Sequence, residues 1–289
     1  MFLELKDTKL YYEEFGQGER CILSAMQQLD PDRKGWPYDL AEEGFHVFAI
    51  QMRGYGQSAH VMEDYGEKWY DIWADDVAEF AAAMGIKRFL YTGASDGGGV
   101  GWHLCLRHPE ILTGFAGLAA GPHSRSIGTI SPSRKYTIDA VGSRAAVEQL
   151  AMYHKQRILY FAKKFGDDPE LKKEFERKAE TIYQMKMDMG PEEMKIQPGI
   201  TLPWLKTDEE VLKALSEIHF PVLLLIGMKD AMVPLGKTVQ PIGAIEHAKA
   251  VFYQEANHLL YYGRREDVRR EIAAFAEEAF EKDGDKTAH

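Results

Sequence analysis

Leu90-Tyr91-Thr92-Gly93-Ala94-Ser95-Asp96-Gly97-Gly98-Gly99 lies between two segments of different character. The apolar run 88–92 predicts a buried strand, and the run 100–107 has the composition of a helix that ends before Pro109. Glycines at 93 and 97 leave room for a sharp turn, and such a turn pushes the Ser95 hydroxyl out of the sheet. The first N–H groups of the following helix then point at the same spot, where they stabilise negative charge.

Strand, tight turn and helix are the context in which Gly-x-Ser-x-Gly forms a nucleophile elbow. The five-residue pattern also occurs in glycine-rich turns without a chemical role, so partner residues have to be found. A serine hydroxyl needs a base to take its proton and a third group to orient that base. Asp230 and His258 each follow a predicted buried strand, 221–227 and 250–253, and the chain order Ser95, Asp230, His258 suits this kind of site.

Length and composition set the general class of the protein. The chain has 289 residues, with 45% hydrophobic and 28% charged side chains, which is ordinary for a globular protein. The net charge of −10 argues against nucleic acid as a partner. Cys21 and Cys105 lie in apolar segments and are expected to be reduced. Because there is no leader-like N-terminus and no apolar run of about 20 residues, we expect a cytoplasmic protein without a membrane span.

Apolar strands that alternate with helices predict a mainly parallel sheet with helices on both faces. The expected strands are a hairpin at 2–6 and 9–14, then 21–25, 45–50, 88–92, 115–119, 221–227 and 250–253; the expected helices include 36–43, 68–84, 100–107 and 264–280. Strand signals nearly vanish over 123–217, which reads as several helices and is too long for a loop. We therefore expect a core domain, 1–122 and 218–289, with a helical lid (cap) at 123–217.

Several motifs resemble those of the α/β-hydrolase superfamily, at matching places over nearly the whole chain. They are Gly93-Ala94-Ser95-Asp96-Gly97-Gly98, His108-Pro109-Glu110 after the elbow helix, Arg53-Gly54-Tyr55-Gly56-Gln57-Ser58, Gly227-Met228-Lys229-Asp230-Ala231-Met232-Val233-Pro234, and Asn257-His258-Leu259-Leu260. The resemblance implies an α/β-hydrolase fold, with a mostly parallel eight-stranded sheet and an inserted lid. It also implies a serine hydrolase without a cofactor, in which Ser95 is the nucleophile, His258 the base and Asp230 the residue that orients the base.

The sequence departs from the family where an oxyanion hole is expected. The family usually has His-Gly after its third strand, whereas this chain has Leu23-Ser24-Ala25-Met26-Gln27-Gln28. The resemblance assigns the donors to the backbone N–H groups of Met26 and Asp96. A backbone donor does not depend on its side chain, so we expect the hole to be retained. Gln27 is either an additional side-chain donor or a surface residue.

Asp96 is a second departure, because a carboxylate beside a developing oxyanion would destabilise it. Asp96 could point away, pair with a cation, or face a donor on the substrate. It could also be the nucleophile itself, as in the related epoxide hydrolases and haloalkane dehalogenases. The elbow helix favours Ser95, which lies at the usual family spacing of 14 residues before Pro109.

The predicted lid is rich in aromatic and methionine side chains, which suit either its own core or an apolar substrate pocket. They are Tyr136, Met152, Tyr153, Tyr160, Phe161, Phe165, Tyr183, Met185, Met187, Met189 and Trp204. The candidate substrate contacts are Gln27, His123, Tyr153, Met232 and Leu259.

No metal-ligand cluster or phosphate loop stands out in the sequence. We expect hydrolysis of a small, mainly apolar carboxylic ester or lactone. A carbon–carbon bond hydrolase with the same triad, and a ligand receptor on a hydrolase scaffold, are the alternatives, and assembly as a homodimer is left open.

Overall fold

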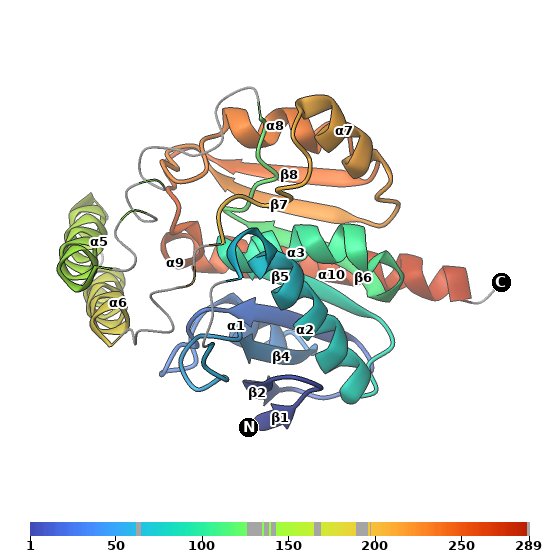
Figure 1. The fold of residues 1–289 in the computed structure, drawn as a ribbon, viewed down its shortest axis with the longest axis horizontal. Helices are drawn as coiled ribbons and strands as arrows, with labels where there is room; N and C mark the ends of the chain where they lie inside the picture. The colour runs from blue at the N-terminus through green and yellow to red at the C-terminus, as the bar shows by residue number, and fades with distance from the viewer. Residues whose placement is uncertain are drawn as a thin grey trace.

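A single eight-stranded sheet runs through the protein (Figure 1). A computed structural model of the chain describes residues 1–61, 65–125, 135, 139, 143–164, 169–188, 196 and 198–287. The strands are β1 Phe2–Glu4, β2 Lys9–Phe15, β3 Cys21–Met26, β4 His46–Gln51, β5 Phe89–Ala94, β6 Leu112–Leu118, β7 Val222–Gly227 and β8 Ala248–Tyr253. Their order is β1-β2-β4-β3-β5-β6-β7-β8, antiparallel at β1–β2–β4 and parallel from β4 to β8. The expected α/β-hydrolase fold is confirmed.

Helices cover both faces of this sheet. They are α1 Trp36–Glu42, α2 Trp69–Ala83, α3 Asp96–Arg107, α7 Asp208–Ser216, α8 Gly236–Ile242, α9 Leu260–Gly263 and α10 Arg265–Thr287, with 3₁₀ turns η1 Gly66–Lys68 and η2 Pro109–Ile111. Side chains of α2, α3 and α7 share one buried apolar cluster, and those of α1 and α10 share the other. None of the helices in the described ranges is both long enough and apolar enough to cross a bilayer.

The strand β7 shows why the central strands are apolar throughout. Leu223 and Leu225 point into the cluster with α1 and α10, whereas Val222, Leu224 and Ile226 point into the other cluster. Each such side chain, once fully buried, contributes about 1.5–3 kcal/mol of transfer free energy. A strand covered on both faces therefore reads as a continuous apolar run instead of an alternating one.

Two long helices stand apart from those that cover the sheet (Figure 1). They are α5 Arg144–Lys164 and α6 Pro169–Met187, which pack against each other around Ile158, Phe175 and Ala179. The helix α7 behaves differently, because Val211 and Leu215 are buried in the core cluster. The expected lid, 123–217, thus includes a helix that the structure places in the core. The predicted lid residues Tyr136, Phe165 and Met189 lie outside the described residues.

The helix after the turn begins four residues earlier than the predicted range 100–107. Its first residue is Asp96, directly after Ser95, and it includes glycines at 97, 98, 99 and 101. Glycine is a poor helix former, which made this segment look like a loop. Here the missing side chains let the helix approach its neighbours: a Cβ on Gly97 would collide with the carbonyl of Ala25, and one on Gly101 with the ring of Phe115.

We predict that Gly101→Ala destabilises the protein by about 1–3 kcal/mol, because the added methyl group overpacks a buried site. The matched control is Gly284→Ala in α10, where an added Cβ meets nothing within 4 Å. This control should be neutral or slightly stabilising, since alanine is the better helix former. Urea unfolding of both variants checks the prediction, and equal stabilities would contradict it.

Candidate active site

Ser95 occupies a strained turn between β5 and α3. Its φ of 53° and ψ of −117° lie where side-chain-bearing residues are rarely found. The backbone on either side holds it there: the Ser95 N–H donates to the carbonyl of Leu118 at 3.0 Å, and the Gly99 N–H donates to the carbonyl of Ser95 at 2.9 Å. Strain of this kind persists only where the surroundings enforce it, and it is concentrated at functional sites.

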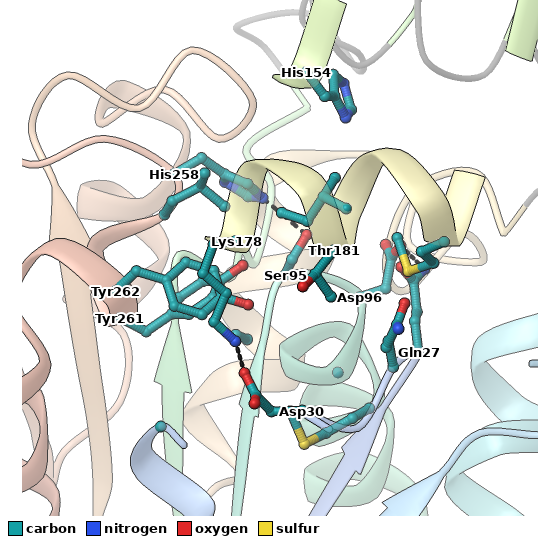
Figure 2. A pocket seen from close by; sticks show the side chains of 18 of the residues that line it. Gln27, Asp30, Ser95, Asp96, His154, Lys178, Thr181, His258, Tyr261 and Tyr262 are labelled. Atoms are coloured by element: carbon teal, nitrogen blue, oxygen red, sulfur yellow. Dashed lines mark hydrogen bonds and ion pairs between the residues drawn. The ribbon is translucent and has the colours of Figure 1, made fainter. Parts of the chain in front are cut away.

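The structure brings Ser95, His258 and Asp230 together, although they lie far apart in the sequence. Figure 2 shows His258 beside Ser95. His258 Nε2 is 2.9 Å from Ser95 Oγ, and His258 Nδ1 is 2.8 Å from Asp230 Oδ2. Each residue follows the carboxyl end of a parallel strand: β5, β8 and β7. Such strand ends meet at one edge of the sheet, which is where open α/β sheets place their ligands.

The carboxylate of Asp230 is buried and fixed in direction. Its Oδ1 accepts hydrogen bonds from the backbone N–H groups of Met232, at 2.7 Å, and Val233, at 2.9 Å. These bonds leave Oδ2 directed at the imidazole of His258. With Nδ1–H donating to Asp230, the other nitrogen of His258 would be free to accept a proton from Ser95.

The candidate oxyanion donors belong to two segments in backbone contact. Met26 ends β3, and Asp96 begins α3, beside Gly97. Because Gly97 has no side chain, the start of α3 lies against the carbonyl of Ala25, next to Met26. The first N–H groups of a helix have no partner inside the helix, so they are suited to an anion.

The side chain of Asp96 is held by two polar neighbours. Oδ2 accepts a hydrogen bond from Gln27 Nε2 at 2.7 Å, and Oδ1 accepts one from the hydroxyl of Tyr70 at 2.7 Å. The same Gln27 nitrogen donates to the hydroxyl of Tyr55 at 3.1 Å. In this structure the amide of Gln27 is therefore hydrogen-bonded to the carboxylate of Asp96. The imidazole of His258, by contrast, is directed at Ser95.

A cavity of about 300 Å³ opens above Ser95 and His258. Of the five candidate substrate contacts, Gln27, Met232 and Leu259 line it, whereas His123 and Tyr153 do not. On α5 it is the neighbour of Tyr153, His154, that lines the cavity, because successive residues of a helix point about 100° apart. Tyr153 itself is 39% exposed. His123 is buried, at 3% exposure.

Apart from Met185, sequence reasoning missed the part of the lining that comes from α6 and α9. Lys178, Thr181, Ile182 and Met185 recur at helical spacing on α6 and face the cavity. That spacing was visible in the sequence, but it did not say which face of α6 would meet the core. Tyr261 and Tyr262 of α9 also line the cavity.

Ion pairs join α6 to the loop after β3, and the pair Lys178–Asp30, shown in Figure 2, is buried. The ammonium group of Lys178 contacts the carboxylate of Asp30, and both side chains are only 4% exposed. Arg177 pairs with Asp32 at 2.6 Å and with Asp30 at 3.4 Å. Removing one member of a buried pair strands the other charge, which is far more costly than losing a surface pair. The position of α6 is thus coupled to the segment that follows Met26.

The ring of His154 lies among positive charges. Burial, followed by the charges of Lys186, Arg157 and His258, lowers the pKa of His154 to about 3. A neutral ring is therefore expected there at neutral pH. In the described part of the chain, no group of three His, Cys, Asp or Glu side chains is arranged to hold a metal ion.

Comparison with known proteins now identifies the family. Residues 27–264 match the α/β-hydrolase fold family, and the chain belongs to it. The AB hydrolase superfamily protein YisY of Bacillus subtilis is 27% identical, over 92% of this chain and 95% of the relative. A pimeloyl-[acyl-carrier protein] methyl ester esterase of Vibrio atlanticus is 24% identical, over 94% of this chain and all of the relative. Among solved structures, a meta-cleavage product hydrolase from Pseudomonas fluorescens has a TM-score of 0.76 at 16% identity, covering 96% of this chain and 98% of that one.

The lowered pKa of His154 predicts acid sensitivity. The unfolded chain binds a proton at this ring below pH 6.5, whereas the folded protein binds it only near pH 3, so stability falls as the pH drops through this window. Between pH 7 and pH 5, we expect the free energy of unfolding of the parent to fall by about 2 kcal/mol more than that of His154→Gln.

Urea unfolding at the two pH values measures this difference. His219→Gln, at an exposed position, is the control and should follow the parent. Identical pH dependence in the parent and in His154→Gln would show that the ring is not buried as described.

Proposed function

We propose that this protein is a serine hydrolase that cleaves a small carboxylic ester or lactone through an acyl-enzyme on Ser95. The observation that carries the proposal is the chain of contacts from Ser95 Oγ to His258 Nε2, at 2.9 Å, and from His258 Nδ1 to Asp230 Oδ2, at 2.8 Å. This is the arrangement in which a histidine makes a serine hydroxyl strongly nucleophilic.

In the proposed reaction, His258 takes the proton of Ser95 as Oγ attacks the carbonyl carbon of the ester. The N–H groups of Met26 and Asp96 stabilise the oxyanion that forms. His258 then gives its proton to the departing alkoxide, and the acyl group stays on Ser95. Water enters, His258 removes its proton, and the resulting tetrahedral intermediate collapses to the free acid while His258 returns the proton to Ser95.

The cavity supports a small and mainly apolar substrate. Its volume of about 300 Å³ is at the lower end of ligand-binding cavities. Much of its lining is aliphatic or thioether: Met26, Leu29, Ile158, Ile182, Met185, Ile196, Met232 and Leu259. The relative from Vibrio atlanticus is named for cleavage of a methyl ester, which agrees with an ester substrate here.

The surroundings of Asp96 favour Ser95 over Asp96 as the nucleophile. Each carboxylate oxygen of Asp96 already accepts a hydrogen bond, from Gln27 or from Tyr70, whereas the imidazole of His258 is directed at Ser95 Oγ. A carboxylate held in this way is less available to attack a carbon atom. We propose that Asp96 instead fixes the loop that carries the Met26 N–H, through its bond to Gln27.

Covalent labelling tests the assignment of Ser95. A fluorophosphonate should add to one residue, which peptide mapping should identify as Ser95. Ser95→Ala should abolish both labelling and the turnover of p-nitrophenyl esters, and His258→Ala should come close to doing so. Asp230→Asn should lower kcat by about 10²–10⁴-fold, because it misorients the imidazole but leaves the nucleophile in place.

Ser216→Ala, at an exposed position, is the matched control and should label and turn over like the parent. Labelling that persists in Ser95→Ala would overturn the assignment. Absence of turnover on every ester and lactone, in a parent protein that still binds them, would favour the receptor alternative.

Replacing the carboxylate separates the two roles of Asp96. If Asp96 only fixes the loop, Asp96→Asn removes one hydrogen bond, because the asparagine oxygen still accepts from one of the two donors. A single hydrogen bond contributes about 1 kcal/mol, so kcat on neutral esters should change by less than about tenfold. Steady-state kinetics on p-nitrophenyl butyrate measure the change. A loss of about a thousandfold or more is the size expected for a catalytic group and would identify Asp96 as the nucleophile.

A further inference from the structure

Two adjacent tyrosines on α9 face the cavity beside Ser95. Tyr261 and Tyr262 both line it, and Figure 2 shows their rings reaching toward Ser95 and Lys178. In the described part of the chain, neither hydroxyl has a hydrogen-bond partner. Both residues keep some exposed surface, and both line the cavity. Two phenol hydroxyls are thus presented to whatever fills this space.

The two rings are held firmly, so their hydroxyls are preorganised. The rings of Tyr261 and Trp36 pack edge to face, with 5.2 Å between their centroids, and the centroids of the two tyrosine rings are 4.5 Å apart. The ammonium group of Lys178 lies 4.5 Å from the centroid of the Tyr262 ring. Burial raises the pKa of both phenols, and the carboxylates of Asp230 and Asp96 raise that of Tyr261 further. Both hydroxyls therefore keep their protons and can donate.

A hydroxyl that a bound molecule covers loses its hydrogen bonds to water unless that molecule supplies a partner. An acceptor supplied by a bound molecule would recover that loss, at about 1 kcal/mol for each bond formed. A site built to bond an oxygen atom also discriminates against an otherwise similar molecule that lacks it, since the donors are then left unpaired.

The charges nearby determine which kind of acceptor fits. Lys178 is already paired with the carboxylate of Asp30. Arg157 and Lys186 also line the cavity, but the charges that act on Tyr261 are the carboxylates of Asp230 and Asp96. A carboxylate or phosphate bound at this hydroxyl would be repelled by them, whereas a neutral ether or ketone oxygen would not.

We propose that Tyr261 and Tyr262 form a specificity subsite that donates hydrogen bonds to an uncharged acceptor oxygen on the substrate. The inference rests on the proposed function, which it deepens. The preferred substrates are esters or lactones whose acyl or alcohol part carries an ether or ketone oxygen within an otherwise apolar chain. The tyrosines select the substrate and take no part in bond making or breaking.

Matched substrates test the subsite by kinetics. One series compares p-nitrophenyl hexanoate with analogues in which one acyl methylene is replaced by an ether oxygen. A second series compares butyl acetate with 2-methoxyethyl acetate, followed by pH-stat. We expect the parent to prefer the oxygen-containing member of at least one series by about tenfold or more in kcat/KM. The preference should fall in Tyr261→Phe and Tyr262→Phe and vanish in the double variant, chiefly through KM.

Tyr160→Phe, on the exposed side of α5, is the matched control and should keep the preference. The subsite would be overturned if the parent had the same kcat/KM for both members of each series, or if the preference survived in the double variant. Neither result would affect the proposal of ester hydrolysis at Ser95. A carboxylate-bearing analogue that surpasses the ether would also overturn it, because the subsite would then be an anion site.

A binding measurement tests the subsite without turnover. Amide analogues of the same substrates, with and without the ether oxygen, are titrated calorimetrically into Ser95→Ala and into Ser95→Ala with both tyrosines replaced by Phe. The Kd of the ether analogue should be about tenfold lower in the first protein, and the two analogues should bind alike in the second. Equal Kd values in both proteins would refute the subsite even if the ester-hydrolase proposal also failed.

Discussion

The close approach of α3 to the end of β3 is the constraint on which the site depends. It exists because Gly97 has no side chain to separate the helix from the carbonyl of Ala25. The approach places the first N–H groups of α3 next to the residue after Ala25, and it leaves Ser95 with a φ of 53° between two fixed elements. A larger residue at 97 would push the helix away and separate the two halves of the candidate oxyanion hole. The strained backbone of Ser95 and the missing side chain of Gly97 thus contribute to the same local arrangement.

A second constraint links α6 to the core. Lys178 of α6 and Asp30 of the loop after β3 form a buried ion pair, and that loop begins next to Met26. The pair contributes little net stability once the cost of removing both charges from water is counted. We expect the pair to favour one position of α6, because any displacement of the helix would separate two buried charges. The cavity wall from α6 and the backbone donor at Met26 are therefore positioned together.

Much of this architecture is predictable from the sequence, because the strong signals are local. Continuous apolar runs marked the central strands, and residues placed just after such runs, Asp230 and His258, meet Ser95 at the sheet edge. The start of α3 was misjudged since glycine lowers helix propensity, while the packing that requires glycine is visible only in three dimensions.

The residues that line the cavity were less predictable, since the rotation of each helix about its axis decides which side chains face the cavity. A shift of one residue separates Tyr153, which is exposed, from His154, which lines the cavity. The helix α7, which lies within the expected lid, has the same helical pattern as α5 and α6, and only its burial in the core cluster sets it apart from them. The sequence could not show that the hydroxyls of Tyr261 and Tyr262 lack hydrogen-bond partners in the described part of the chain, because that depends on the fold.

The central claim is that the reaction passes through an acyl group on Ser95. Mass spectrometry of the protein quenched within its first turnover of an ester measures this directly. The account predicts a transient gain in mass equal to one acyl group, on the peptide that contains Ser95 and not in Ser95→Ala. Product formed during the first turnover with no adduct at any time, or an adduct on Asp96, would contradict it.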